Sequence, residues 1–144
     1  MAVILIVDDE PGARRLLARC LDGLDHEILE AESADAALQQ MAQRAAALVF
    51  CDIQMPGRDG LWLAAELRRQ YPAAAIVLAT SVSTVPPRLS MQTGVLAYLV
   101  KPFRREFVIE ALETALKWHD ATVATGPRPE DTIDGLQQWL DSLE

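Results

Sequence analysis

The stretch AAALVFCDIQMPGRDG (residues 45–60) decides the fold class, because it joins a short apolar run to an acid and a turn. The run at 47–51 has the length and composition of a strand buried on both faces, which is typical of parallel sheets. Asp52 stands at its end, and Met55-Pro56 begins a turn. An acid in that place either caps the turn or belongs to a chemical site, and the rest of the chain decides between the two.

Short apolar runs alternate along the chain with segments whose apolar residues recur at helical spacing. The expected strands are 2–7, 26–33, 47–51, 74–79 and 95–100. The expected helices are 11–24, 34–45, 60–70 and 103–119, with a weak one inside 81–94, where Pro86-Pro87 must sit at or before the first turn. This alternation predicts an α/β fold, a doubly wound five-stranded parallel sheet with helices on both faces.

Apolar stripes indicate the buried side of two helices. The stripe of the first helix contains Leu16, Leu17, Cys20, Leu21 and Leu24, and that of the last contains Phe103, Phe107, Ala111, Leu112 and Ala115. Ser33 is the expected N-cap of the helix that follows it.

The length of 144 residues fits one domain with little left over. We expect a globular domain over 1–121, a linker over 122–130 and an acidic amphipathic helix over 131–144. From Glu130 onward there are five acids and no base. This last segment either packs on its own domain, begins an output region, or serves as an interaction helix.

Composition excludes several classes of function. The net charge is −8 and no basic stripe occurs, so direct binding of nucleic acid is not expected. No apolar stretch approaches the ~20 residues of a transmembrane helix, and the start lacks the basic region of a signal peptide. We therefore expect a cytoplasmic protein without membrane contact. Cys20 and Cys51 lack metal-like spacing and are expected to be buried, reduced thiols.

Chemically active side chains follow four of the five expected strands. Ligands of open parallel sheets bind beyond the carboxyl ends of the strands, so these side chains are expected in one crevice. They are Asp8 and Asp9 after the first strand, Asp52 after the third, Thr80 and Ser81 after the fourth, and Lys101 with Pro102 after the fifth. The second strand ends at Glu32-Ser33 and looks uninvolved.

The residue types suit phosphoryl chemistry. Neighbouring carboxylates raise one another's pKa, and Mg²⁺ relieves that repulsion. A lysine and a hydroxyl then suit the remaining phosphoryl oxygens. Asp52 stands alone on the central strand and is the expected nucleophile. Taken singly, each residue has a structural explanation, such as a cap or a solvated lysine, but the four strand ends together indicate a site.

The chain resembles a response-regulator receiver domain of two-component phosphorelays over roughly residues 2–120. The resemblance rests on VDDE (7–10), on D-x-x-M-P-x-x-D-G (52–60), on Thr80 after an apolar strand, and on Tyr98-x-x-Lys101-Pro102-Phe103. It implies the strand order 2-1-3-4-5.

The resemblance also implies a metal and a phosphorylation site. Asp52 accepts the phosphoryl group from a phospho-His donor or a small phosphodonor. Asp9 and Asp52 hold Mg²⁺ (or Mn²⁺), together with the backbone carbonyl of Gln54 and with Asp8 acting through water.

The remaining site residues are implied to form a switch. Lys101 pairs with Asp52 beforehand and with the phosphoryl oxygens afterwards. Thr80 moves toward the phosphoryl group, and Tyr98 rotates into the space that it leaves. A cis bond is implied before Pro102. Ser81 departs from the family, which usually has Ala or Gly there.

The implied function is a switch that catalyses only its own phosphorylation and dephosphorylation and is not otherwise an enzyme. Its partners are a sensor histidine kinase or phosphotransfer protein and an output domain or partner protein. The surface around the fourth helix, fifth strand and fifth helix carries the signal. A homodimer through that surface is common in the family and stays an option, although Pro86-Pro87 and a shortened fourth segment alter it.

Three other classes of protein share parts of this pattern. A haloacid-dehalogenase-type phosphatase needs an acid two residues after its nucleophile, where this chain has Gln54. A flavodoxin needs a phosphate loop after the first strand, where DDEPG (8–12) would repel phosphate. A receiver-like protein-interaction module that does not cycle phosphate remains open.

Overall fold

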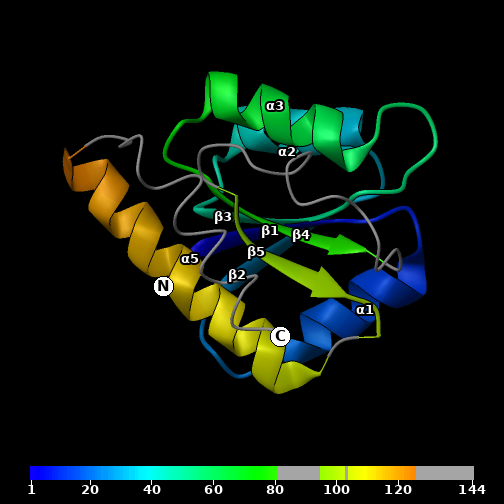
Figure 1. Cartoon of the computed structure of the whole chain (residues 1–144), viewed down its shortest axis with the longest axis horizontal. Coiled ribbons are helices and arrows are strands. Elements are labelled where there is room, and N and C mark those ends of the chain that lie inside the picture. Colours follow the sequence, from blue (N-terminus) through cyan, green and yellow to red (C-terminus); the bar gives the residue numbers. More distant parts are fainter. Residues whose placement is uncertain (81–94, 103, 126–144) are drawn as a thin grey trace.

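A single parallel sheet organises the molecule, with helices on both of its faces (Figure 1). The computed structural model describes residues 1–80, 95–102 and 104–125, apart from the side chain of Thr80. Its elements are β1 (Val3–Val7), α1 (Pro11–Cys20), β2 (Glu27–Ala31), α2 (Ala34–Gln43), β3 (Leu48–Asp52), α3 (Gly60–Gln70), β4 (Ala75–Thr80), β5 (Val95–Val100) and α5 (Arg105–Thr125). The expected weak helix in 81–94, Phe103 and the expected helix in 131–144 lie outside the described residues.

The strand order is β2-β1-β3-β4-β5, and every neighbouring pair is parallel, as predicted. The four strands with chemically active ends are therefore adjacent, and β2 lies at the edge. Val7 of β1 is in register with Cys51 of β3, so Asp8, which follows β1, and Asp52, the last residue of β3, lie side by side.

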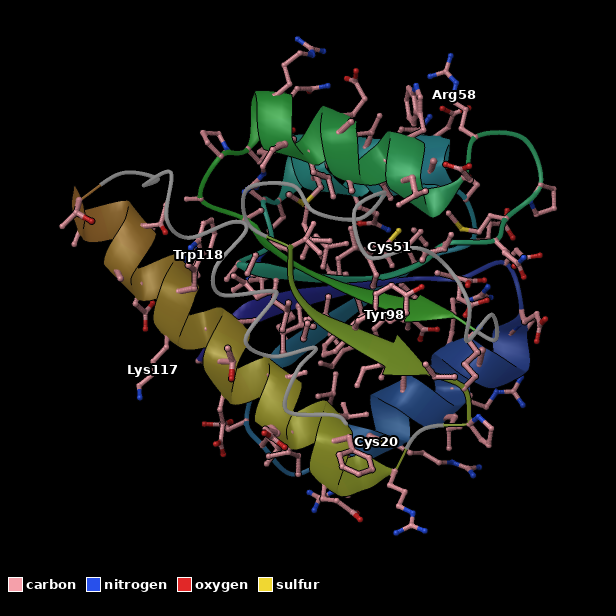
Figure 2. The ribbon with its side chains drawn as sticks, viewed as in Figure 1. Cys20, Cys51, Arg58, Tyr98, Lys117 and Trp118 are labelled. Carbon is pink, nitrogen blue, oxygen red and sulfur yellow. The ribbon has the colours of Figure 1, made fainter. Side chains whose placement is uncertain are left out.

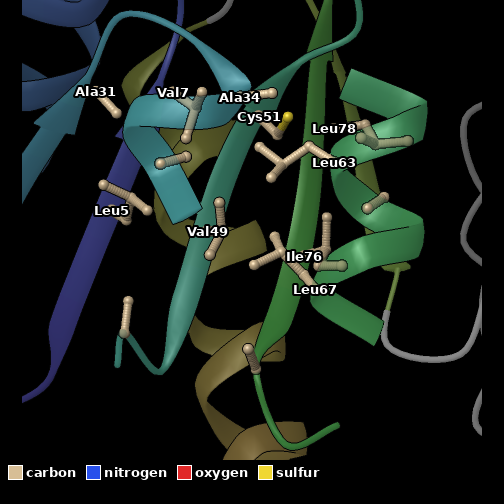
Figure 3. Packing of buried hydrophobic residues seen from close by; sticks show 14 of the residues in the cluster. Leu5, Val7, Ala31, Ala34, Val49, Cys51, Leu63, Leu67, Ile76 and Leu78 are labelled. Carbon is tan, nitrogen blue, oxygen red and sulfur yellow. The ribbon is translucent and has the colours of Figure 1, made fainter. Parts of the chain in front are cut away.

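The sheet separates two apolar cores. On one face α2 and α3 cover alternate residues such as Val49 and Cys51, and Figure 3 shows Leu63 and Leu67 of α3 beside them. On the other face α1 and α5 cover the intervening residues, including Phe50. All five residues of β3 are buried, which explains the continuous apolar run in its sequence.

Two helices begin at side-chain caps. The Ser33 hydroxyl accepts a hydrogen bond from the Ala36 N–H at 3.1 Å, which confirms the predicted cap of α2. The Asp59 carboxylate accepts one from the Trp62 N–H at 2.8 Å and caps α3. This second cap fixes the start of α3 directly behind the turn that follows Asp52.

The structure corrects several boundaries and faces. Helix α1 ends at Cys20 rather than at residue 24, and α5 continues to Thr125, so the first four residues of the expected linker are helical. Leu16 is 43% exposed because its neighbour Leu17 takes the inward position. Phe107 is 48% exposed for the same reason, since Val108 points inward. Adjacent helical residues lie about 100° apart, so one of each pair must turn away.

Cys20 and Cys51 are free and buried, as predicted. Among the helices that the structure describes, none is long and apolar enough to span a bilayer.

The central position of β3 leads to a stability prediction. Phe50→Ala should lower the free energy of unfolding by about 3–5 kcal/mol, because it leaves a cavity in a fully buried layer. Val123→Ala on exposed α5 surface should change it by less than about 0.5 kcal/mol. Urea unfolding followed by circular dichroism measures both values. A small effect of Phe50→Ala would contradict the two-sided burial of β3.

Candidate functional site

Three carboxylates converge at the carboxyl ends of β1 and β3. Asp8 and Asp52 are each only 5% exposed, and Asp9 lies nearer the surface. One oxygen from each of the three lies within 4.8 Å of the others. The parallel register of β1 and β3 produces this closeness, because it places the two strand ends level with each other.

Backbone N–H groups orient the two buried carboxylates. Asp8 Oδ1 accepts a hydrogen bond from the Glu10 N–H at 2.9 Å, and Asp52 Oδ1 accepts one from the Gln54 N–H at 3.3 Å. Both are local turns in which an Asp side chain bonds the backbone two residues on. They engage one oxygen of each carboxylate, and the other oxygen faces Lys101.

Lys101 lies between the two acids but closer to Asp8. Its Nζ donates to Asp8 Oδ2 at 2.6 Å and lies 3.6 Å from Asp52 Oδ2. The expected pairing of Lys101 with Asp52 is therefore present as an ion pair, and a shorter contact with Asp8, which was not expected, accompanies it. The reason is geometric, since one ammonium between two fixed carboxylates bonds the better aligned one.

The charged groups of the site shift the pKa values of Asp52 and Lys101. Burial, followed by the charge of Asp8, raises the pKa of Asp52 to about 6, although Lys101 and the Gln54 N–H act in the opposite direction. For Lys101, burial is the largest influence and lowers its pKa. The hydrogen bond to Asp8 and the charges of Asp52, Asp8 and Glu10 outweigh burial, so the net pKa is raised. The site thus carries excess negative charge that a cation can offset.

A cleft of about 400 Å³ opens beside Asp52. Its lining combines acids, Lys101 and an apolar wall, and consists of Glu10, Ala13, Leu16, Asp52, Gln54, Lys101 and Pro102. The backbone N–H of Gln54 is engaged by Asp52. A larger cavity of about 720 Å³ lies near the amino ends of the strands and contains none of the predicted site residues.

The expected switch residues lie on neighbouring strands. Thr80 ends β4 and is in register with Val100, and Ser81 lies outside the described residues. Tyr98 is buried in the core on the α2–α3 side, the side that also holds Cys51 (Figure 2). Its hydroxyl has no hydrogen-bond partner among the described residues. The Lys101–Pro102 peptide is cis, as the resemblance implied.

Gly60 has a structural role that the motif alone did not explain. A Cβ at this position would lie 2.1 Å from the carbonyl oxygen of Asp52. The Gly60 N–H also donates to the Ile53 carbonyl at 2.9 Å. Only glycine therefore allows α3 to begin directly against the backbone of Asp52, and the D-G pair at 59–60 was the available sequence signal.

Arg14 was also missed. Its Nη1 donates to the Asp8 carbonyl at 2.6 Å, and its Nε lies 3.3 Å from Glu30 Oε1 in β2. No sequence pattern indicated this contact, because an arginine at this point of α1 is indistinguishable from a solvated one.

Comparison with known proteins identifies the family. The family model described as the response regulator receiver domain matches residues 4–113. The chain belongs to this family, and it is a receiver domain of the two-component response-regulator type. The fold, the strand order and the resemblance drawn from the sequence are thereby confirmed.

Named relatives are longer than this chain. The response regulator protein FleR of Pseudomonas aeruginosa is 36% identical over 135 residues, which cover 93% of this chain and 27% of FleR. The KDP operon transcriptional regulatory protein KdpE of Escherichia coli is 32% identical, over 88% of this chain and 56% of KdpE. The chain thus spans roughly a quarter to just over half of these relatives.

A solved structure of similar size is the response regulator protein TrrA of Thermotoga maritima in complex with Mg²⁺-BeF. It is 37% identical with a TM-score of 0.74, covering 81% of this chain and all of TrrA. NtrX of Brucella abortus is 33% identical with a TM-score of 0.78, over 85% of this chain and 29% of NtrX.

The three clustered carboxylates can bind a metal ion. Hard divalent cations prefer carboxylate oxygens. Burial and, after it, repulsion by Asp8 raise the pKa of Asp52, and such a cation stabilises the charged carboxylate against both. The residues present therefore fit the metal that the family resemblance implied.

Close approach of α3 leads to the first prediction for the site. Gly60→Ala should destabilise the protein by about 2 kcal/mol or more, because the new methyl group collides with rigid backbone at Asp52. Gly12→Ala is the matched control: it has open space and should be neutral or stabilising by up to about 1 kcal/mol. Thermal and urea unfolding compare the two. Equal stabilities would show that α3 is not held against Asp52.

The raised pKa of Asp52 leads to a second prediction, for protein without divalent cations. The pKa falls from about 6 in the folded state to 3.8 on unfolding. Between these values the folded state binds more protons, so the charged carboxylate costs stability above pH 6 and this cost disappears toward pH 4. Asp52→Asn should therefore be more stable than the wild type by on the order of 2 kcal/mol at pH 7.5.

Urea unfolding at several pH values measures this difference. It should shrink steadily below pH 6. A difference independent of pH, or an Asn variant less stable than the wild type at pH 7.5, would contradict the raised pKa.

Proposed function

We propose that the chain is a phosphorylation-controlled switch in which Asp52 accepts a phosphoryl group. The observation that carries this proposal is the buried Asp52 carboxylate, which shares one cluster with two further carboxylates and has Lys101 Nζ at 3.6 Å. An Asp52 oxygen attacks phosphorus, and the bond from phosphorus to the donor nitrogen breaks. The bonding electrons return to the donor imidazole, which leaves neutral because its other nitrogen already carries a proton.

The proposed metal is Mg²⁺, with Mn²⁺ as a substitute. Its ligands are Asp9, Asp52 and the backbone carbonyl of Gln54, with Asp8 acting through water. When bound, Mg²⁺ offsets the negative charge that gathers on the phosphoryl oxygens. The relative TrrA, whose structure contains Mg²⁺-BeF, supports this choice.

The proposed switch uses the neighbouring strand ends. Lys101 leaves Asp8 and pairs with a phosphoryl oxygen, and Thr80 donates a hydrogen bond to another. Tyr98 then rotates into the space that Thr80 leaves. Its hydroxyl has no hydrogen-bond partner among the described residues, and the rotation allows it to form one. Ser81 and Pro102 support the geometry around Thr80 and Lys101. The signal emerges on β5, α5 and the segment 81–94.

The proposed partners follow from the family. A histidine kinase or phosphotransfer protein supplies the phosphoryl group in the cytoplasm, and an output domain or separate protein reads the result. The chain acts on its own Asp52 and on no other substrate. Several relatives are transcriptional regulators that extend well beyond the matched region, so the proposed lack of nucleic-acid contact concerns this chain alone. We also propose a receiver domain over 1–121, whose last helix continues to Thr125, then a linker up to residue 130. Residues 131–144 are proposed to form an acidic amphipathic helix or the start of an output region.

Intact mass spectrometry after incubation with acetyl phosphate tests the proposal. The wild type should gain one phosphoryl group in the presence of Mg²⁺ and none in its absence. Asp52→Asn should gain none. Asp22→Asn makes the same chemical change in the turn after α1 and should behave as the wild type.

A wild type that gains no phosphoryl group from acetyl phosphate or from a phospho-His donor, although it binds Mg²⁺, would reject the phosphoacceptor role. The chain would then be an interaction module that does not cycle phosphate. An adduct that persists in Asp52→Asn would assign the reaction to another residue.

A further inference from the structure

Arg14 connects the acidic loop to a strand that was expected to be uninvolved. Its side chain is only 16% exposed and crosses from α1 to the end of β1. There Nη1 donates to the Asp8 carbonyl at 2.6 Å, while Nε donates to Glu30 Oε1 at 3.3 Å. One planar guanidinium thus bonds the residue that follows β1 and a residue of β2.

Besides its ion pair with Lys101, Asp8 is held by three hydrogen bonds. Its N–H donates to the Ala31 carbonyl at 3.1 Å, its Oδ1 accepts from the Glu10 N–H, and its carbonyl accepts from Arg14. Two of these contacts depend on β2, directly through Ala31 and indirectly through Glu30. The end of β2 therefore helps to hold the loop although it contributes no side chain to the site.

We propose that Arg14 is a positioning residue for the metal site, oriented by Glu30. It fixes the peptide that joins Asp8 to Asp9, and so sets the direction of both carboxylates. This inference rests on the metal site of the proposed function. Groups that orient metal ligands without touching the metal commonly change affinity 10- to 100-fold when they are removed.

If Arg14 acted only through its charge, its removal would change the metal affinity in the opposite direction. The direction of the change therefore tests the proposal. Arg14 is a cation near a site for cations, so removing its charge should tighten metal binding if electrostatic repulsion were its main effect. Removing a positioning contact should weaken metal binding instead, because the loop must then be ordered at the expense of binding free energy.

The experiment measures Mn²⁺ binding by electron paramagnetic resonance of the free ion, with no phosphodonor present. Arg14→Ala should bind Mn²⁺ about 10- to 100-fold more weakly than the wild type. Arg14→Lys keeps the charge but lacks the two-pronged geometry, and should also bind more weakly, by a smaller factor.

Two matched controls separate positioning from charge and from general stability. Arg15→Ala removes the same charge from an exposed position of α1 and should leave the Mn²⁺ affinity unchanged or slightly tighter. Arg44→Ala breaks another arginine–glutamate pair with β2, to Glu27, far from the acids and should not alter Mn²⁺ affinity.

Mn²⁺ binding by Arg14→Ala and Arg14→Lys as tight as that of the wild type would overturn the inference. If Arg14→Ala does not fold, Arg14→Lys decides alone. A wild type that binds no Mn²⁺ would overturn both the metal site and the role of Arg14. A wild type that binds Mn²⁺ but accepts no phosphoryl group would overturn the proposed function, while weakened Arg14 variants would still support the positioning role.

Discussion

Two buried carboxylates stand side by side because β1 and β3 are parallel neighbours in the centre of the sheet. Burial disfavours their charged forms, and each charge raises the cost of the other. The sheet tolerates this arrangement because Lys101, from the end of β5, places its ammonium between them. The charge state of the site therefore depends on all three strand ends together: the two carboxylates repel each other, and the ammonium of Lys101 offsets that repulsion.

Close packing around β3 prevents the two carboxylates from moving apart. Every residue of β3 is buried, and cores on both faces restrain its end. Behind the strand, α3 begins so close to Asp52 that only a glycine fits between them. The Asp59 cap fixes that helix start, so the turn after Asp52 cannot withdraw without uncapping α3. Protein packed this closely cannot separate the carboxylates to relieve their repulsion.

Much of this could be predicted from the sequence. Continuous apolar runs in the sequence indicate strands buried on both faces, and in a parallel sheet the carboxyl ends of such strands meet at one edge. The direction of individual side chains was harder to predict. Leu16 and Phe107 belong to apolar stripes, but the adjacent residues in the sequence point inward in their place. The closer pairing of Lys101 with Asp8 depends on ångström-scale alignment, which spacing does not encode. Arg14 gave no signal, since its partners are a backbone carbonyl and a residue 16 positions away.

Helix α5 begins three residues after Pro102, which lines the cleft. From there it runs along the sheet to the opposite side of the domain (Figure 1). His119, near its end, lies 2.6 Å from the carbonyl of Ala73, just before β4 begins. At 1.5 Å per residue, the 21 residues of α5 span about 30 Å. Thr125 therefore lies at the end of the domain away from the acids. Helix α5 is thus one continuous element that runs the depth of the domain, from the end that holds the acids to Thr125.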